Sequence, residues 1–527
     1  MPATPRHQEE LLDLAADYVH GTITAADGSR LEAMLHASPA ARREFVDYCM
    51  LHGQMALSTT AVGQGDAAAG TLHRPGSTLP RIGRAAAMLA GLALAAAFVV
   101  IVGNTPREEP SQNPASDSYD NRQLPLVTVA NLQVDGETPT PLNPTTLRPD
   151  KATALRSASG ADVNVAEAAV FGVTTGDSGT LYHGSVQARL AKPDANFSVT
   201  TSNLRIVDKG TAFHVDRIDN DHVAVTVLDG EVEVQSRVRL PVCYWPFDDV
   251  DSARGSGQAF DAVGGLPATL GSAATPVAGI VGAGAVRFDN APSAVATIGG
   301  GAGEQVGTGL FAMAEGITIE AVVVSAWSGR FKDYDEIFRK EDGDARMLLS
   351  FQNDGTTHED FSEPPVQAGP CLSLGLHLAG RGYHELDMPL DGVDGRPTLA
   401  EITDGKPHHV VATYDSYTGR KAIFIDGRKR FEHAYPVGTL VRCGGPAPAE
   451  IGNTRGTEPF TGMIDEFALY DFALTPDEVA THWQRVAAGQ NYFGSAPPAP
   501  GSPRWQAITR LVEGQTMTFN QETGLPR

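Results

Sequence analysis

Two acidic residues, Glu385 and Asp387, are the best candidates for catalytic chemistry in this sequence. They lie two apart in a strand-like run, so both side chains would point to one face of a sheet. Hydrolysis of a glycosidic bond with retention of configuration needs two carboxylates about 5 to 5.5 Å apart. The run continues as Met388, Pro389 and Leu390, without the second glutamate of an ExDxxE pattern, and a proline disturbs a central strand. We therefore expect no catalytic residues and no enzymatic activity.

Histidine and cysteine patterns do not predict a transition-metal site. His408 and His409 are adjacent in a strand-like run, so their side chains should point to opposite faces and serve structural roles. The sequence contains no CxxC or HxxxCxxC spacing, which is what a zinc site of the anti-sigma-factor kind would require. No cofactor is certain from these patterns.

The element that must organise the rest of the chain is an apolar segment, residues 83–103. Between Arg84 and Asn104 there are 19 residues without a charge or a proline, close to the ~20 that a helix needs to cross a bilayer. A buried core helix would normally show a polar face, and a signal peptide would lie near the start of the chain. The segment is therefore predicted to be a single transmembrane helix.

The flanks of this segment predict its orientation. Three arginines precede it, whereas Arg107 beyond it is followed at once by two glutamates. An excess of basic residues holds a flank in the cytoplasm. We expect the N-terminus inside, the larger C-terminal part in the periplasm, and the protein in the inner (cytoplasmic) membrane.

Length and charge bound the remaining possibilities. A chain of 527 residues exceeds what one hydrophobic core normally serves, so two to four domains are expected. The formal net charge of -23 argues against direct binding of nucleic acid, because phosphate binding needs clustered Lys and Arg.

Residues 1–57 have the pattern of three short helices with one apolar stripe each. Thr24 and Asp27 resemble a capping box ahead of the second helix. The stripes can pack against one another or against a partner, and the residues leave both readings open. The string HGTITAADGSRLEAMLHASPAARREFVDYCMLHGQM resembles the N-terminal region of bacterial FecR-type regulators. That resemblance implies an extracytoplasmic-function sigma factor as the cytoplasmic partner.

A flexible tether, residues 58–82, and a proline-rich linker, residues 104–150, flank the apolar segment. Residues 151–237 then alternate apolar and polar side chains, and Asp229-Gly230 is a strong hairpin signal. The runs LYHGSVQARL, FSVTTSNLRIVDKGTAFHVD and VTVLDGEVEV resemble the FecR sensor domain. The resemblance implies a periplasmic β-domain that relays a signal inward.

Residues 238–487 contain short strand-like runs at the intervals typical of a two-sheet sandwich. The runs YWPFDD, VGAGAVRFDN, ITIEAVV, HHVVATYDSYTGRKAIFIDGR and FTGMIDEFALYDFALTPDEV resemble the LamG-like, concanavalin A-like lectin and glucanase fold. Within the last run, Thr475 and Pro476 predict the start of a closing helix. Residues 488–527 begin with a proline-rich stretch and are predicted to be a C-terminal tail. The fold class is thus multidomain and mainly β, with a small N-terminal helical segment and one transmembrane helix.

Resemblance to calcium-bearing sandwiches implies that Asp248 and Asp465 face each other across a sheet edge and bind calcium. The alternative is that Asp248 and Asp249 are turn residues and Asp465 a surface carboxylate. Three cysteines lie on the predicted outer side, which permits one disulfide at most. Cys371 with Cys443 is one candidate pair, but the pairing stays open.

Together these observations predict a single-pass membrane signalling protein. A FecR-like part would regulate a sigma factor, and an outer LamG-like domain would bind a glycan or a protein. An envelope-anchored adhesion or glycan-binding protein without sigma-factor regulation is the alternative. A membrane-anchored glycoside hydrolase is disfavoured by the missing carboxylate pair.

Overall fold

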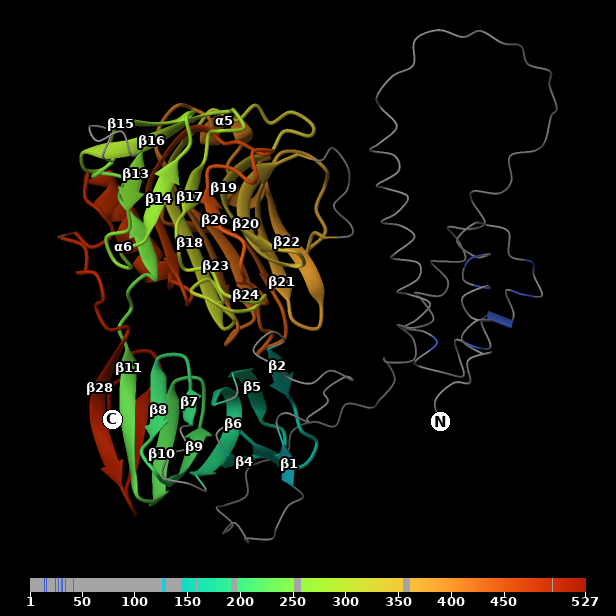
Figure 1. Cartoon of the computed structure of the whole chain (residues 1–527), viewed down its shortest axis with the longest axis vertical. Coiled ribbons are helices and arrows are strands. Elements are labelled where there is room, and N and C mark those ends of the chain that lie inside the picture. Colours follow the sequence, from blue (N-terminus) through green and yellow to red (C-terminus); the bar gives the residue numbers. More distant parts are fainter. Residues whose placement is uncertain are drawn as a thin grey trace. The chain divides into compact units, whose positions relative to one another are not determined.

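The structure is a computed structural model, and its chain divides into two compact units, residues 1–118 and 119–527 (Figure 1). In the second unit it describes residues 126–128, 144–157, 160–175, 177–190, 197–250, 257–353, 361–494 and 496–527. In the first unit it describes Leu14, Ala16, Thr24, Asp27, Arg30, Leu31, Met34 and Ala41.

The first unit carries one predicted cap. The Asp27 backbone N–H donates to Thr24 Oγ1 at 3.2 Å, and Thr24 Oγ1 donates to Asp27 Oδ2 at 2.6 Å. Leu14 and Leu31 are buried in one apolar cluster with Met34 packed against it.

Residues 83–103, the predicted transmembrane helix, lie outside the described residues, as does the predicted tether. The predicted linker, residues 104–150, is described only at 126–128 and 144–150, where it contains two strands, Leu126–Thr128 and Thr145–Leu147, that pair with strands of the β-domain. Its assignment to a linker over its whole length is therefore wrong. Within the described part of the chain, no helix is long and apolar enough to cross a membrane.

The first half of the second unit is a β-domain, in which alternating residues fill one core. The core contains Val163, Phe213, Val225 and Val234, each at most 1% exposed. Its strands as far as residue 237 are β1 (Leu126–Thr128), β2 (Thr145–Leu147), β3 (Thr153–Arg156), β4 (Ala161–Val165), β5 (Val170–Thr175), β6 (Ser178–Leu190), β7 (Ser198–Thr200), β8 (Leu204–Asp208), β9 (Ala212–Arg217), β10 (His222–Asp229) and β11 (Glu231–Arg237). A turn at Asp229-Gly230 joins β10 to β11, and Gly230 has a positive φ of 79°. The predicted hairpin is nevertheless wrong, because β10 pairs with β9 and with Thr516–Asn520, whereas β11 pairs with β8 and with Trp505–Val512.

The last residues of the chain return to this β-domain and complete it. Strand β28 (Trp505–Val512) pairs antiparallel with β11, and β29 (Thr516–Asn520) pairs antiparallel with β10. Figure 1 shows β28 beside β11, next to the C-terminus. The assignment of all of residues 488–527 to a tail therefore needs correction. Leu511 and Phe519 are buried in the β-domain core, and their apolar contacts are the physical reason for the return.

The segment between β11 and β28 forms the predicted sandwich, which is thus an insertion into the β-domain. Among the described residues it has two eight-stranded sheets. The first contains β12 (Cys243–Trp245), β15 (Ala274–Ala278), β16 (Gly284–Asp289), β18 (Gly316–Ser325), β23 (His408–Asp415), β24 (Arg420–Ile425), β25 (Arg428–Ala434) and β27 (Thr461–Tyr470). The second contains β13 (Gln258–Phe260), β14 (Pro267–Leu270), β17 (Ala296–Ile298), β19 (Asp335–Asp342), β20 (Ala345–Gln352), β21 (Cys371–Leu378), β22 (Gly382–Pro389) and β26 (Ala449–Ile451).

Apolar side chains from both sheets meet in one large core. Ile319 and Phe467 come from the first sheet, and Leu349 and Leu374 from the second, and all four are fully buried. Short helices close the fold: η2 (Val393–Gly395), α5 (Leu399–Ile402) and α6 (Pro476–Ala487).

Helix α6 begins as the sequence predicts. Thr475 is its N-cap, Pro476 follows, and Thr475 and Glu478 form a reciprocal capping box. Its Val479 and Val486 join Tyr492 in a cluster on the outer face of the first sheet. The chain is therefore ordered by packing as far as Tyr492, beyond the predicted end of the sandwich.

The three described cysteines, Cys243, Cys371 and Cys443, are buried, and none of them is in a disulfide. Cys371 Sγ donates to the Gln352 carbonyl at 3.4 Å, and Cys443 Sγ donates to the Phe311 carbonyl at 3.0 Å. The candidate pair Cys371 and Cys443 is thus not a disulfide in this structure.

Candidate ligand cleft between the β-domain and the sandwich

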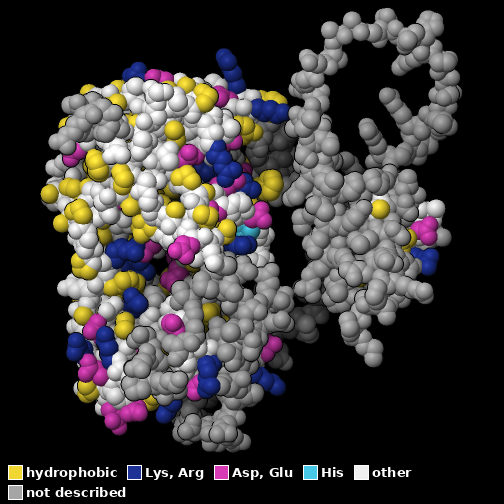
Figure 2. All heavy atoms as spheres, viewed as in Figure 1, with side chains coloured by type: hydrophobic (Ala, Val, Ile, Leu, Met, Phe, Trp, Pro, Cys, Tyr) yellow, Lys and Arg dark blue, Asp and Glu magenta, His cyan; other side chains and the backbone are white. Residues whose placement is uncertain are grey.

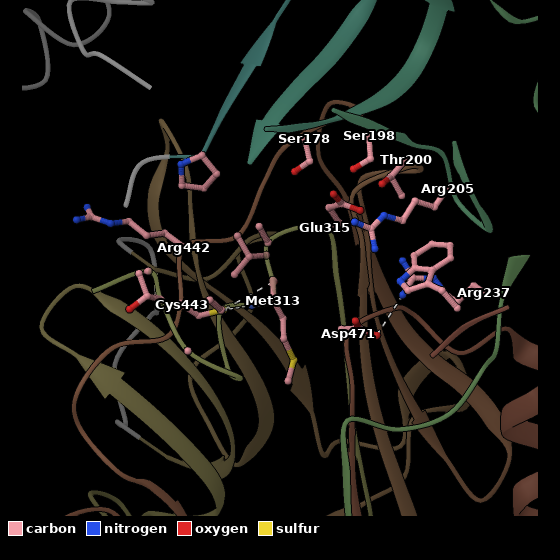
Figure 3. Close-up of a pocket in the computed structure, with 18 residues that line it drawn as sticks. Ser178, Ser198, Thr200, Arg205, Arg237, Met313, Glu315, Arg442, Cys443 and Asp471 are labelled. Carbon is pink, nitrogen blue, oxygen red and sulfur yellow. Dashed lines mark hydrogen bonds and ion pairs between the residues drawn. The ribbon is translucent and has the colours of Figure 1, made fainter. Parts of the chain in front are cut away.

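A cleft of about 470 Å³ lies where the β-domain meets the inserted sandwich (Figure 3). Its β-domain wall comes from β6, β7, β8, β11 and β28, and its sandwich wall from the loops before β18, before β26 and after β27. The charged lining residues are Arg205, Arg237, Glu315, Arg442 and Asp471. Binding sites for small molecules usually measure about 300 to 1,000 Å³ and have a few convergent polar groups.

Arg237 joins the two walls of the cleft. At the end of β11, it pairs with Asp471 of the sandwich, with 3.2 Å between Nη1 and Oδ1. Its guanidinium carbon lies 4.5 Å from the centroid of the Trp505 ring and 5.5 Å from that of Phe472. Arg504 pairs with the other oxygen of Asp471 at 3.1 Å. The Asp471 charge is therefore compensated by two arginines, one on each connection to the sandwich.

Glu315 lies on the sandwich wall, just before β18. Its carboxylate accepts hydrogen bonds from the Thr180 hydroxyl and, at 3.4 Å, from Tyr417 OH. Burial raises the pKa of Glu315, and the hydrogen bond from Thr180 opposes that shift only in part. The cleft therefore holds one carboxylate whose charge is disfavoured and one that is already paired.

Arg205 differs from Arg237, Glu315 and Asp471, which are all engaged by other residues. Arg442 on the sandwich wall likewise has no side-chain partner among the described residues, but it extends away from Glu315 (Figure 3).

Strand β8 buries Leu204 and Ile206 on its core side, so Arg205 between them faces outward. Its side chain is partly buried and extends into the cleft on the side of Glu315 (Figure 3). Within the described part of the chain, its guanidinium has no hydrogen bond or ion pair.

Direct contacts hold the two walls together beside the cleft. Tyr182 OH and Ser416 Oγ are 3.1 Å apart, and the rings of Tyr182 and Tyr417 are 4.8 Å apart. The Thr146 hydroxyl donates to the Gly438 carbonyl, and the Arg148 guanidinium donates to the Val437 carbonyl. The β-domain thus contacts the sandwich directly beside the cleft.

The predicted calcium ligands hold one turn of the sandwich. Asp465 Oδ2 accepts from the backbone N–H groups of Ile280 and Val281 at 2.9 Å each, and Asp248 Oδ1 accepts from Ala283 and Gly284. Asp465 is fully buried, whereas Asp248 is exposed. The two residues therefore share the segment 280–284, but backbone donors occupy an oxygen of each.

A third carboxylate, Glu466, lies beside them. Tyr244 OH donates to its Oε2 at 2.5 Å, while its buried Oε1 has no hydrogen-bond partner among the described residues. Burial, with Asp465 and Asp248 nearby, raises the pKa of Glu466 to about 8, and burial raises that of Asp465 to about 7. In the described residues, no group of three or more His, Cys, Asp or Glu side chains is placed to hold a metal ion. Calcium binding at Asp248 and Asp465 stays a prediction.

Glu385 and Asp387 are in β22 and share one face, as expected. Both are buried, and other side chains already engage them. Gln352 Nε2 donates to Glu385 Oε2 at 2.9 Å and to Asp387 Oδ1 at 3.3 Å, while Tyr383 OH donates to Glu385 Oε1 at 2.6 Å. The pair belongs to a buried hydrogen-bond network, and none of its members lines the cleft described above.

His408 and His409 point to different surroundings. His408 Nδ1 contacts Asp426 at 3.0 Å, whereas His409 Nε2 contacts the buried Glu320 at 2.7 Å. His482 of α6 contacts the same oxygen of Glu320 at 2.8 Å. The predicted structural role of both histidines fits these contacts, and the one through His409, Glu320 and His482 attaches α6 to the sheet.

The residues of the cleft were not among the sequence-predicted sites. Alternation in NLRIVD predicts that Arg205 faces outward, but not what it faces. Trp505 lies in WQAITRLV, an alternating run whose strand pattern could have been recognised inside the predicted tail. Pairing over more than 260 residues of chain cannot be read from a single sequence.

Two family models match this chain. The model described as FecR protein matches residues 145–233. The model described as concanavalin A-like lectin/glucanases superfamily matches residues 338–480. The first match covers most of the β-domain before the insertion, and the second lies within the sandwich.

Among curated proteins, human C-reactive protein is 28% identical over 137 residues, which are 24% of this chain and 57% of that protein. The chain thus spans little more than half of that relative. Among solved structures, the binding domain of Paraclostridial Mosquitocidal Protein 1 is 13% identical with a TM-score of 0.34, over 46% of this chain and 52% of that one. Domain 4 of the arabinanase AbnA from Geobacillus stearothermophilus, in complex with arabinotriose, is 17% identical with a TM-score of 0.30, over 46% and 97%. With both family matches, the chain joins a FecR-type segment to a concanavalin A-like, LamG-like segment, as its sequence predicts.

Proposed function

We propose that this protein is a single-pass inner-membrane regulator of an extracytoplasmic-function sigma factor, with the sandwich as its outer ligand-binding part. The observation that carries the proposal is the presence of FecR and LamG-like matches in one chain. The apolar segment at 83–103 and its basic N-terminal flank support the topology. The acidic net charge of -23 fits a regulator that acts through protein partners.

The insertion supplies a physical route from ligand to regulator. Because the sandwich begins after β11 and ends before β28, both of its connections arise from neighbouring strands of the β-domain, where Arg237 pairs with Trp505. A ligand that shifts the sandwich therefore acts on two adjacent strands at once. Such a ligand shifts the β-domain between two conformations only to the extent that it binds the protein in one of them more tightly than in the other.

Arg239, in the first connection, reinforces this route. Its guanidinium contacts both oxygens of Glu478, at 2.5 and 2.7 Å, and donates to Asn203 Oδ1 of the β-domain at 3.2 Å. Glu478 is in the first turn of α6, and His482 one turn later contacts Glu320 under the helix. A movement of α6 on the sandwich would therefore displace Arg239 and alter its hydrogen bond to Asn203 of the β-domain.

The second candidate is an envelope-anchored adhesion or glycan-binding protein without sigma-factor regulation. The same insertion would then serve only to hold the sandwich rigidly on a spacer. Glycoside hydrolysis is disfavoured, because Glu385 and Asp387 are buried among hydrogen-bonding partners.

Capture of partners by the full chain separates the first two candidates. The chain is solubilised from the native membrane, purified by a C-terminal tag, and its partners are identified by mass spectrometry. A variant lacking residues 1–57 is the matched control. We expect an extracytoplasmic-function sigma factor with the full chain and its loss with the control. A full chain that recovers no sigma factor contradicts the regulator and favours the adhesion protein.

A further inference from the structure

We propose that the cleft between the β-domain and the sandwich binds a carboxylated sugar, with the Arg205 guanidinium as the main contact to the carboxylate. This inference deepens the proposed function, on which its signalling consequence rests, because it names the ligand class and the site. The binding step itself does not depend on any sigma factor.

The charge of the cleft is the first reason. The whole chain has 40 basic and 63 acidic residues. The cleft reverses this ratio, with three arginines against Glu315 and Asp471, and burial disfavours the charge of Glu315. A positive concavity in a strongly acidic protein concentrates anions at one place.

The free guanidinium of Arg205 is the second reason. Asp471 is already shared by Arg237 and Arg504, and within the described residues Arg205 has no partner of its own. A guanidinium presents five N–H donors in a planar fork that matches the two oxygens of a carboxylate. Arg205 is partly buried and lines the cleft. A carboxylate paired with it would therefore be bound more strongly than one paired with an exposed arginine.

The hydroxyl-bearing wall next to Arg205 is the third reason. Ser198 and Thr200 of β7 line the cleft beside it (Figure 3). In the part of the chain that the structure describes, their hydroxyls make no hydrogen bond. Hydroxyl groups donate and accept equally, so they suit the hydroxyls of a sugar ring better than they suit a bare inorganic anion. The volume of about 470 Å³ is within the range of small-ligand sites.

The position of the cleft gives this ligand a consequence. Arg205 and the two hydroxyls belong to the β-domain, whereas Glu315 and Arg442 belong to the sandwich. A ligand seated between them contacts both parts and stabilises the arrangement in which they close on it. Its binding free energy is thereby coupled to the relation between the β-domain and the sandwich.

Calorimetric titration of the full chain in detergent tests the site. The probes are digalacturonic acid, its uncharged dimethyl ester, and inorganic phosphate. We expect the acid to bind, and the ester and phosphate each to bind at least about tenfold more weakly. The ester lacks the charge that the Arg205 guanidinium would bind, and phosphate lacks the ring hydroxyls that Ser198 and Thr200 would bind.

Variants then assign the contact to Arg205. R205Q should weaken binding of the acid about tenfold or more, and R205K should lie between it and the native protein because it keeps the charge but not the fork. R189Q, at an exposed arginine of β6 outside the cleft, should bind like the native protein, and unchanged melting temperatures exclude misfolding.

Three outcomes would overturn the proposal: no binding of digalacturonic acid, equal binding of acid and ester, or native affinity in R205Q. Phosphate binding without acid binding would also overturn it, by showing an inorganic anion site. None of these results bears on sigma-factor capture, which tests the proposed function separately.

Discussion

At the scale of single residues, the sandwich depends on a buried carboxylate that the sequence does not single out. Glu320 is fully buried and accepts contacts from His409, His482 and, at 3.0 Å, Tyr470 OH. Burial opposes its ionisation, but His482 and His409 outweigh burial and lower the pKa of Glu320 to about 2. An ionised group with three partners fixes α6 on the first sheet.

Replacing Glu320 tests this role. Glu320→Gln removes the charge and leaves buried histidines without it, so the free energy of unfolding should fall by about 3 to 5 kcal/mol. Denaturant unfolding measures the loss. Glu304→Gln, at an exposed site, is the control and should change stability by less than about 0.5 kcal/mol. Equal stability of the two variants would mean that Glu320 does not hold the helix.

Glu466 should make stability depend on pH. Its folded-state pKa of about 8 is above the usual value, so its contribution is fully present below about pH 4.5 and is lost as the pH rises through about 8. The melting temperature of the native protein should therefore fall between pH 5 and pH 8, and Glu466→Gln should make that fall smaller. An equally large fall in the variant would show that Glu466 does not cause this pH dependence.

Calcium is a separate prediction for the same turn. A divalent cation at Asp248 and Asp465 would favour the ionised form of Asp465, whose pKa burial raises to about 7. Millimolar calcium should therefore raise the melting temperature more at pH 8 than at pH 5. Asp248→Asn should reduce that shift. Equal melting temperatures in calcium and in chelator, at both pH values, would mean that these carboxylates only hold the turn.

At the scale of elements, the C-terminal strands are as much part of the β-domain as those before the insertion. Strand β28 covers the edge of β11, and β29 covers β10. Without them, two rows of backbone donors and acceptors would be exposed, which favours aggregation. A FecR-type domain split by a sandwich therefore needs its last residues in order to fold.

Substitution of one core residue tests how much the C-terminal strands stabilise the β-domain. Phe519 is fully buried in the β-domain core, so Phe519→Ala should destabilise the β-domain by about 3 to 5 kcal/mol. Val512→Thr, at a side chain 46% exposed on the neighbouring strand, should have little effect. Denaturant unfolding measures the stability of both variants. If Phe519→Ala is as stable as Val512→Thr, β29 does not stabilise the β-domain core.

How far the sequence predicts these elements depends on the range of their contacts. The turn at Gly230 and the start of α6 at Thr475 are local features, and the sequence predicts both. It does not predict which strands pair, because β10 and β11 on either side of the turn pair with other strands and form no hairpin. The pairing of β11 with β28 joins residues on either side of the whole sandwich, so no local pattern indicates it. The cleft at Arg205 was missed for the same reason, because it exists only once the insertion brings two distant segments together.

At the scale of the whole molecule, the second unit has its sandwich inserted within the β-domain rather than attached to the end of it. On the face shown in Figure 2, Lys and Arg side chains of the described residues lie among acidic ones. The two connections, the Arg239 contacts and the cleft at Arg205 all lie where the β-domain meets the insertion. Signalling by the proposed regulator would pass through that junction.

Excision of the sandwich tests the insertion most directly. In the full chain, residues 239–503 are replaced by Asn-Gly, which suits a two-residue hairpin because the Val238 N–H already donates to the Arg504 carbonyl at 2.8 Å. Circular dichroism and denaturant unfolding are the readouts. The account predicts a β-domain that unfolds in one cooperative transition. A protein that is unfolded or aggregated, while the native chain in the same detergent is folded, would contradict the claim that the sandwich is an insert in an otherwise complete FecR-type domain.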